Sequence, residues 1–189
     1  MRALLLVLLF APVAAQAAES EELPTELQAQ LLSKMTTYVK GLAPAGATSL
    51  KVLVVYPGAA DSPPTRAATA MVDALSKLGQ MGTYKVDVKP QVFTDERALQ
   101  AALATEKPQV VYVTGEHTTK SLGFVVAAVK SVGGVVSVSG TPSHVEQGVV
   151  LGFGAAEGRP RVLVNLKQAR EQGVSFHNGL LRYAVIVEQ

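Results

Sequence analysis

Short apolar runs alternate with amphipathic segments along most of the chain, in the order expected for strands and helices that follow one another. The run at residues 50–56 is almost continuously apolar and β-branched, and Pro57 and Gly58 close it. Such a run is typical of a central strand in a parallel sheet, because helices cover both of its faces. Residues 84–93 alternate apolar and polar positions, which predicts a strand nearer the edge of the sheet.

The same reading extends to the middle of the chain. We expect strands at residues 50–56, 84–93, 109–114 and 135–139, and helices at residues 24–41, 65–78, 95–104 and 118–130. Pro24 suits the first turn of the first helix, and Thr94 is expected to cap the third. Strands that alternate with helices predict a single doubly wound, mostly parallel α/β sheet of the Rossmann-like or flavodoxin-like class.

The last third of the chain breaks this alternation. Residues 147–153 and 161–165 are two extended stretches, and the Gly-rich segment between them is too short for a crossover helix. We therefore expect a C-terminal β-hairpin that closes the sheet antiparallel.

Two C-terminal helices are expected after this hairpin. Asn165 should cap the first, which runs to Gln172 and ends at Gly173. The second is expected at residues 178–187, where the Leu180–Leu181 pair should pack against the sheet.

The first residues have the features of a cleavable secretory signal. Arg2 precedes an apolar run that is too short to span a bilayer, and residues 15–17 have the small-x-small pattern of a signal-peptidase site. We expect cleavage after Ala17, which leaves residues 18–189 as one α/β domain in the periplasm.

Composition excludes several classes of function. The 17 Lys and Arg residues nearly balance the 15 Asp and Glu residues, and no basic run is present, so we expect no nucleic-acid partner. The chain has no Cys, which excludes disulfides, thiolate metal sites and cysteine nucleophiles.

Two stretches imitate nucleotide-binding loops. Residues 152–158 are rich in glycine, but a turn and a strand follow them instead of the helix that would receive a pyrophosphate. Residues 115–121 follow a strand and open a helix, but they lack the second glycine, and the spacing to Lys120 is one residue short. We therefore expect no cofactor and interpret Thr118 as a helix cap, with a small anion at this helix start as the alternative.

Hydrolytic chemistry also lacks a complete set of residues. The sequence has no Gly-x-Ser-x-Gly motif, and its histidines do not form a metal-ligand pair. His117 and His144 each follow a predicted strand, so they are expected at the carboxyl edge of the sheet. The sequence predicts neither an enzyme nor a metal site.

One set of residues near the C-terminus carries a family resemblance: Asn165, Leu166, Ala169, Arg170, Gly173, Phe176, Leu180, Leu181 and Arg182. In this order the set resembles the end of the YfiR/HmsC-like family. The resemblance implies a non-enzymatic periplasmic regulator that binds and restrains an inner-membrane signalling protein of the diguanylate cyclase or sensor-kinase type. The partner surface is expected near the first helix or the C-terminal segment. The sequence does not decide between a monomer and a homodimer.

An alternative function is small-ligand binding. The predicted sheet resembles one lobe of an ABC transporter solute-binding protein, although such receptors close two lobes on their ligand. The ligand would lie at the carboxyl ends of the strands, at Gly58, Ser62, Gly115, Thr118, Ser139 and Gly140.

Overall fold

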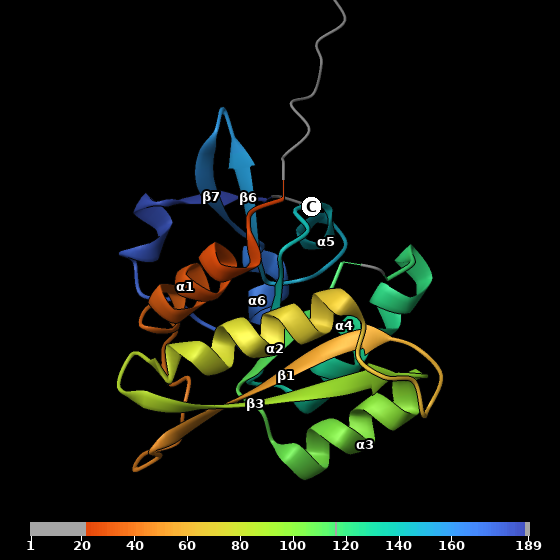
Figure 1. Ribbon diagram of the computed structural model, residues 1–189. Coiled ribbons are helices and arrows are strands. Elements are labelled where there is room, and N and C mark those ends of the chain that lie inside the picture. Colours follow the sequence, from red (N-terminus) through yellow and green to blue (C-terminus); the bar gives the residue numbers. More distant parts are fainter. Residues whose placement is uncertain (1–21, 116, 188–189) are drawn as a thin grey trace, which may run out of the picture.

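The computed structural model describes residues 22–115 and 117–187, so the predicted signal peptide lies outside the described residues. The described strands are β1 (Ser49–Pro57), β2 (Gln80–Met81), β3 (Tyr84–Phe93), β4 (Val110–Val113), β5 (Val136–Ser139), β6 (Leu151–Ala156), β7 (Arg159–Val164) and β8 (Ala184–Ile186). The helices are α1 (Thr25–Thr36), α2 (Arg66–Leu78), α3 (Glu96–Glu106), α4 (Thr119–Val132), α5 (Ser143–Glu146), α6 (Leu166–Glu171) and the 3₁₀ turn η1 (Leu180–Arg182) (Figure 1).

The described strands form one sheet in the order β2-β3-β1-β4-β5-β6-β7-β8. Strands β3, β1, β4, β5 and β6 are parallel, which confirms the predicted doubly wound sheet. The chain builds outward from β1 to β3 and then returns to place β4 on the other side of β1. Ligands of open α/β sheets bind at such a switch point, outside the carboxyl ends of the strands.

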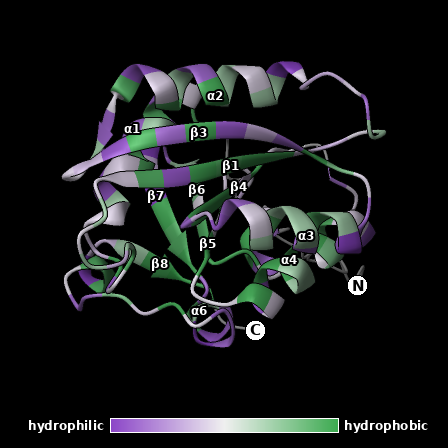
Figure 2. Ribbon diagram, turned by 90° about the horizontal axis from the view of Figure 1, so that it is seen from below, coloured by the Kyte–Doolittle hydropathy of each residue, from purple (hydrophilic) through white to green (hydrophobic). Residues whose placement is uncertain are grey.

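Two apolar cores lie on the two faces of the sheet. Successive side chains of a strand point to opposite faces, so Tyr112 of β4 packs in one core while Val111 and Val113 pack in the other. Helices α1 and α2 cover the first face, and α3 and α4 cover the second (Figure 2). The central strands β1, β4 and β5 are therefore buried on both sides, as their apolar runs indicate.

Most predicted helix starts agree with the caps in the structure. Thr118 Oγ1 accepts from the Ser121 amide at 3.2 Å, and Asn165 Oδ1 accepts from the Gln168 amide at 3.0 Å. The prediction for the third helix is wrong by one residue, because Asp95 and not Thr94 provides the cap. The first helix ends at Thr36, five residues before the predicted Gly41.

The predicted β-hairpin is confirmed, since β6 and β7 pair antiparallel. Glu157 and Gly158 form its two-residue turn, with φ angles of 53° and 69° that suit the right-handed twist of a hairpin. Gly152 lies inside β6 instead of in a loop, and a Cβ there would overlap the Val145 side chain. Gly152 therefore serves strand packing, whereas Gly158 serves the turn.

The predicted final helix at residues 178–187 is wrong. Residues Leu180–Arg182 form one 3₁₀ turn, and β8 then pairs parallel with β7, with Ala184 opposite Val162. The β-branched run that starts at Val185 favours a strand, and β7 offers it an unpaired edge. As a result Leu180 is fully buried, whereas Leu181 is 41% exposed.

Candidate functional site

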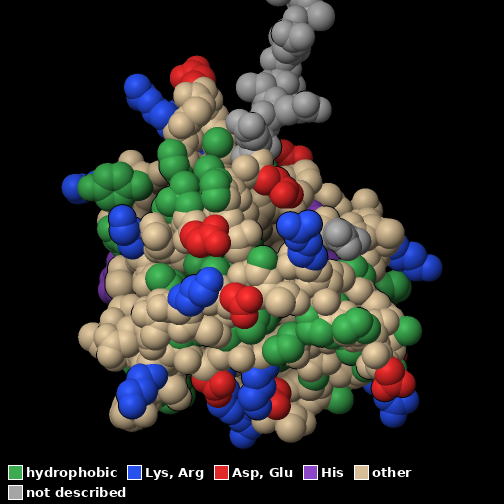
Figure 3. All heavy atoms as spheres, viewed as in Figure 1, with side chains coloured by type: hydrophobic (Ala, Val, Ile, Leu, Met, Phe, Trp, Pro, Cys, Tyr) green, Lys and Arg blue, Asp and Glu red, His purple; other side chains and the backbone are tan. Residues whose placement is uncertain are grey.

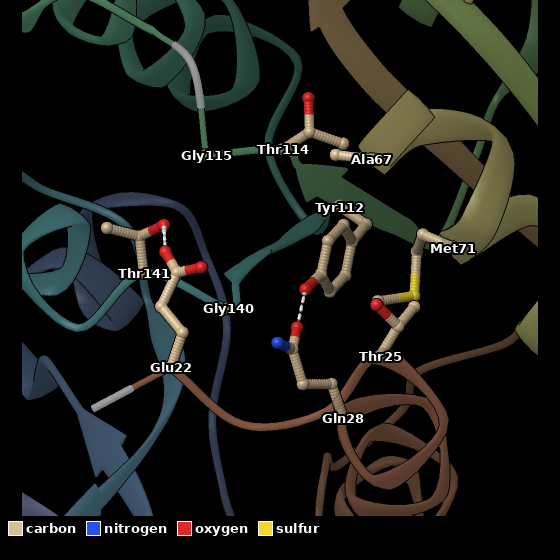
Figure 4. Close-up of a pocket in the computed structure, with 10 residues that line it drawn as sticks. All are labelled: Glu22, Thr25, Gln28, Ala67, Met71, Tyr112, Thr114, Gly115, Gly140 and Thr141. Atoms are coloured by element: carbon tan, nitrogen blue, oxygen red, sulfur yellow. Dashed lines mark hydrogen bonds between the residues drawn. The ribbon is translucent and has the colours of Figure 1, made fainter. Parts of the chain in front are cut away.

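A small polar cavity lies at the carboxyl edge of the sheet, beside the switch point between β1 and β4 (Figure 4). Its volume is about 80 Å³, and the ends of β4 and β5, the helices α1 and α2, and the segment before α1 all contribute to its wall. The lining residues are Glu22, Thr25, Gln28, Ala67, Met71, Tyr112, Thr114, Gly115, Gly140 and Thr141. We call this space the carboxyl-edge cavity.

A buried polar pair forms one side of the cavity. The Tyr112 hydroxyl donates to Gln28 Oε1, and Gln28 Nε2 donates to the Leu23 carbonyl at 2.6 Å. Burial raises the pKa of the Tyr112 hydroxyl, and the charge of Glu22 raises this pKa further. The phenol is therefore a neutral donor at physiological pH and fixes the orientation of the Gln28 amide.

The opposite side joins the N-terminal segment to the end of β5. Thr141 Oγ1 donates to Glu22 Oε1 at 2.7 Å. Two glycines leave the space open: a Cβ on Gly115 would stand 3.0 Å from Thr141 Oγ1, and a Cβ on Gly140 would overlap the Gln28 amide. Gly140 therefore requires the absence of a side chain, and a side chain at Gly115 would require Thr141 to shift.

The structure brings together two of the six residues predicted for ligand binding. Gly115 and Gly140 line the carboxyl-edge cavity, as expected from their place after β4 and β5. Thr118 caps α4 instead. Ser62 folds back on its own turn, where its Oγ accepts from the Ala59 amide at 3.0 Å.

The two remaining predicted residues also lie outside the cavity wall. A Cβ on Gly58 would meet Ser62, so this glycine belongs to the turn after β1. Ser139 is fully buried, and its hydroxyl donates to the Val113 carbonyl at 3.1 Å while it lies 2.9 Å from His144 Nδ1. This serine faces a histidine, but burial keeps it from any substrate.

The histidines do lie near each other at the carboxyl edge, as predicted. Burial lowers the pKa of His117 to about 4, and the nearby His144 adds to the effect. Burial also lowers the pKa of His144, with Glu22 opposing it. Both rings are therefore neutral at pH 7. Among the described residues no group of three or more His, Asp or Glu side chains could hold a metal ion.

A second feature of functional interest is the C-terminal edge of the sheet. Four large apolar side chains are exposed there: Leu181 by 41%, Tyr183 by 72%, Val185 by 44% and Ile186 by 37%. Figure 3 shows apolar side chains gathered over this part of the molecule, at the upper left. We call these four residues the apolar edge.

The two ends of the sheet differ in how they are protected. Next to the short β2, strand β3 carries Lys85, Asp87, Lys89 and Pro90, and the Lys89 ammonium pairs with Glu106 at 2.8 Å. Charges and proline on an outer strand discourage pairing with another chain. Strand β8 consists of Ala, Val and Ile, so at this end of the sheet, as far as residues 22–115 and 117–187 show, the outer strand has neither charge nor proline.

The sequence model of the YfiR/HmsC-like family matches residues 25–185. This chain belongs to the YfiR/HmsC-like family. The match confirms the resemblance seen at the C-terminus, and membership in this family suggests a periplasmic regulator. No curated protein matches the chain. The described part contains no helix of the length and apolar character needed to cross a membrane.

In this family member, the signature residues serve mainly the fold. Asn165 is fully buried, caps α6 and donates through Nδ2 to the Val145 carbonyl at 3.0 Å. Gly173 has a φ of 70°, which suits a residue that ends a helix. Leu180 completes the core, and Leu181 alone of the leucine pair reaches the surface.

Solved structures with a similar fold include substrate-binding proteins. A conserved domain protein of Vibrio cholerae O1 biovar El Tor is similar at a TM-score of 0.60 and 17% identity, over 87% of this chain and 60% of its own length. An ABC domain of Streptococcus pneumoniae in complex with L-Trp is similar at a TM-score of 0.57 and 15% identity, over 87% of this chain and 60% of its own length. A ligand-free, open substrate-binding protein with adhesive properties from Clostridium difficile is similar at a TM-score of 0.55 and 15% identity, over 95% of this chain and 68% of its own length.

These proteins are longer than the family member described here, which spans about 60% of the length of the first two. At these identities the similarity shows the fold alone. It agrees with the predicted likeness between this sheet and a solute-binding lobe.

Sequence reasoning missed the side chains that α1 and its preceding segment bring to the cavity, Glu22 and Gln28. One signal was available. Gln28 lies at helical spacing from Leu32 and Met35, which are buried, so a polar residue occupies the inward stripe of the helix. A polar side chain at such a position needs a hydrogen-bond partner in the interior, and here Tyr112 is that partner.

Proposed function

We propose that this protein is a non-enzymatic periplasmic regulator that binds the periplasmic domain of an inner-membrane signalling protein through the apolar edge. The exposed side chains of Leu181, Tyr183, Val185 and Ile186 carry this proposal, since they concentrate on β8 and on the turn that leads into it. Contiguous apolar surface of this kind is typical of protein interaction sites. Membership in the YfiR/HmsC-like family supports the choice of partner.

The form of the edge favours strand addition. Val185 lies opposite Leu163 in β7, whereas Ala184 and Ile186 point to the other face of the sheet. Apolar side chains of β8 are therefore exposed on both faces of the sheet, with Val185 on one face and Ile186 on the other. A partner strand placed there would satisfy the free backbone groups of β8 and cover these side chains together.

Basic residues beside the edge define the chemistry of the partner. Arg159 and Arg161 are exposed on β7, and Arg182 is exposed in the turn before β8. Arg161 and Tyr183 each precede the first β7–β8 residue pair by one position, so they lie at the same end of the ladder. We expect the partner to present an apolar strand with acidic residues beside it.

The test uses cells that lack the protein and are complemented with variants. Tyr183→Glu places a charge in the apolar edge, and an aromatic anchor of an interface typically contributes about 2 kcal/mol or more. The matched control is Phe124→Glu, which changes an exposed aromatic residue of α4 far from β8 in the sheet order. Both proteins should be exported and fold normally.

The readout is the output of the signalling partner. If the partner is a diguanylate cyclase, deletion raises cellular cyclic di-GMP, the wild type and Phe124→Glu restore the low level, and Tyr183→Glu does not. If the partner is a sensor kinase, phosphorylation of its response regulator follows the same pattern. Full complementation by Tyr183→Glu for both outputs contradicts the proposal.

Small-solute binding is a second candidate function. The carboxyl-edge cavity favours it, because it occupies the place where open α/β sheets hold ligands. One structure of similar fold is described as a complex with L-Trp, although a space of about 80 Å³ is small for an indole side chain.

A further inference from the structure

We propose that the carboxyl-edge cavity binds a small ligand through an ammonium group, as in a primary amine. This inference is independent of the partner surface, because the cavity lies between α1, α2 and the ends of β4 and β5, away from β8. It also differs from the anion site considered at the start of α4, where Thr118 is engaged as the helix cap.

Several oxygen acceptors of the cavity have free hydrogen-bonding capacity. Among the described residues Glu22 receives one hydrogen bond, from Thr141 to Oε1, which leaves Oε2 available. Thr114 donates its hydroxyl hydrogen to the Val55 carbonyl, and Thr141 donates its own to Glu22. The hydroxyl oxygens of both threonines therefore retain lone pairs, and an ammonium group supplies three donors.

Three donors at this edge are already engaged. The Thr141 amide donates to Ser139 Oγ at 3.1 Å, and the Tyr112 hydroxyl donates to Gln28. Gln28 Nε2 is directed to the Leu23 carbonyl. The first two of these groups therefore offer no hydrogen to an anion, whereas the oxygen atoms of Glu22, Thr114 and Thr141 can accept from a cation.

The negative charge of the cavity wall also favours a cationic ligand. Among the described residues that line the cavity, Glu22 is the only charged one. Its charge adds to burial in raising the pKa of Tyr112, and it opposes burial by raising the pKa of His144. The ion pairs in the described part of the chain join Lys89 to Glu106 and Lys130 to Glu171, so neither neutralises Glu22. An ammonium ligand would supply a positive charge to pair with the Glu22 carboxylate.

The size of the cavity limits the ligand. A volume of about 80 Å³ accommodates an ammonium group and a short carbon chain. The apolar side chains of Ala67 and Met71 form part of the wall, which suits a methylene group next to the nitrogen. The open space itself depends on Gly115 and Gly140.

The experiment titrates the purified protein with methylammonium chloride and follows its ¹H–¹⁵N NMR spectrum, with sodium acetate and sodium chloride as separate controls. We expect saturable shifts of the Gly115, Gly140 and Thr141 amides with methylammonium in the millimolar range, and none with either control salt. Shifts that do not saturate, or equal shifts with acetate, overturn the proposal.

Two matched pairs of variants locate the binding. Glu22→Gln should weaken methylammonium binding roughly tenfold or more, because a charge-assisted hydrogen bond is lost, whereas Glu26→Gln in the first turn of α1 should leave it unchanged. Gly115→Ala should block the cavity, whereas Gly123→Ala adds a methyl group to open space on α4. Unchanged affinity in both Glu22→Gln and Gly115→Ala contradicts the assignment.

The two proposals fail separately. Tyr183→Glu should bind methylammonium as the wild type does, and Glu22→Gln should still restore the signalling output in cells. Loss of methylammonium binding in Tyr183→Glu, with its spectrum otherwise native, would show that the two sites are not independent and would overturn the inference.

Discussion

The leucine pair at residues 180 and 181 provides the sharpest test of the C-terminal structure. A helix at 178–187 would bury both side chains, whereas the 3₁₀ turn buries Leu180 completely and leaves Leu181 41% exposed. We therefore expect Leu180→Ala to destabilise the protein strongly and Leu181→Ala to change its stability little. The two variants remove the same atoms from adjacent positions, so each is the control for the other.

The magnitude follows from burial. Leu180 is among the largest fully buried side chains and belongs to the core under α1. Truncation of a buried leucine costs about 2–5 kcal/mol, the sum of lost transfer free energy and the cavity that remains. Surface substitutions stay within about 0.5 kcal/mol. For a domain of this size, about 3 kcal/mol corresponds to a fall in Tm of roughly 6–12 °C.

Urea denaturation followed by circular dichroism gives the free energy of unfolding of both variants directly. The reasoning is refuted if Leu181→Ala is destabilised as much as Leu180→Ala, since that result requires both leucines to be buried. A small effect for both would show that residues 180–186 do not contribute to the core. Either outcome would also remove the structural basis for the apolar edge.

Two further predictions concern stability. Asn165→Ala removes the cap of α6 and also the buried hydrogen bond to the Val145 carbonyl, which then keeps only the longer bond from the Gly148 amide, so the free energy of unfolding should fall by about 1–3 kcal/mol in urea denaturation. Thr65→Ala removes only a cap and should cost less, and an equal loss would contradict the role of the buried bond. Burial lowers the pKa of His117 from 6.5 to about 4, so the contribution of the neutral ring to the free energy of unfolding is complete above pH 6.5 and is lost as the pH falls towards 4. The free energy of unfolding of His117→Gln should therefore fall less steeply than that of the wild type between pH 6.5 and 4. Identical pH profiles of the two proteins would refute this prediction.

The sequence predicts the parallel half of the fold well because its strands are buried on both faces. A run such as residues 50–56 has one plausible environment, and turn residues mark both of its ends. The hairpin was also predictable, since the link between β6 and β7 is too short for a crossover. The error at residues 178–187 has a physical cause: a short apolar run fits either a helix or a strand, and the choice depends on the free edge of β7.

The candidate sites were less predictable because they depend on long-range packing. Gly115 and Gly140 follow from the rule that ligands bind at the carboxyl ends of parallel strands. Glu22 and Gln28 do not, because nothing local places the start of α1 over β4 and β5. The apolar edge likewise exists only because Tyr183 directly precedes the last strand of the sheet and Val185 lies on it, so that neither is on a packed helix.

Site-specific photo-crosslinking in living cells tests the proposed function most directly. A photoreactive amino acid replaces Tyr183 in one protein and Phe124 in another, and mass spectrometry identifies the crosslinked products. The proposed function predicts that position 183, but not position 124, crosslinks to the periplasmic domain of an inner-membrane cyclase or sensor kinase. A product that joins two copies of this chain, or the same product from both positions, would contradict it.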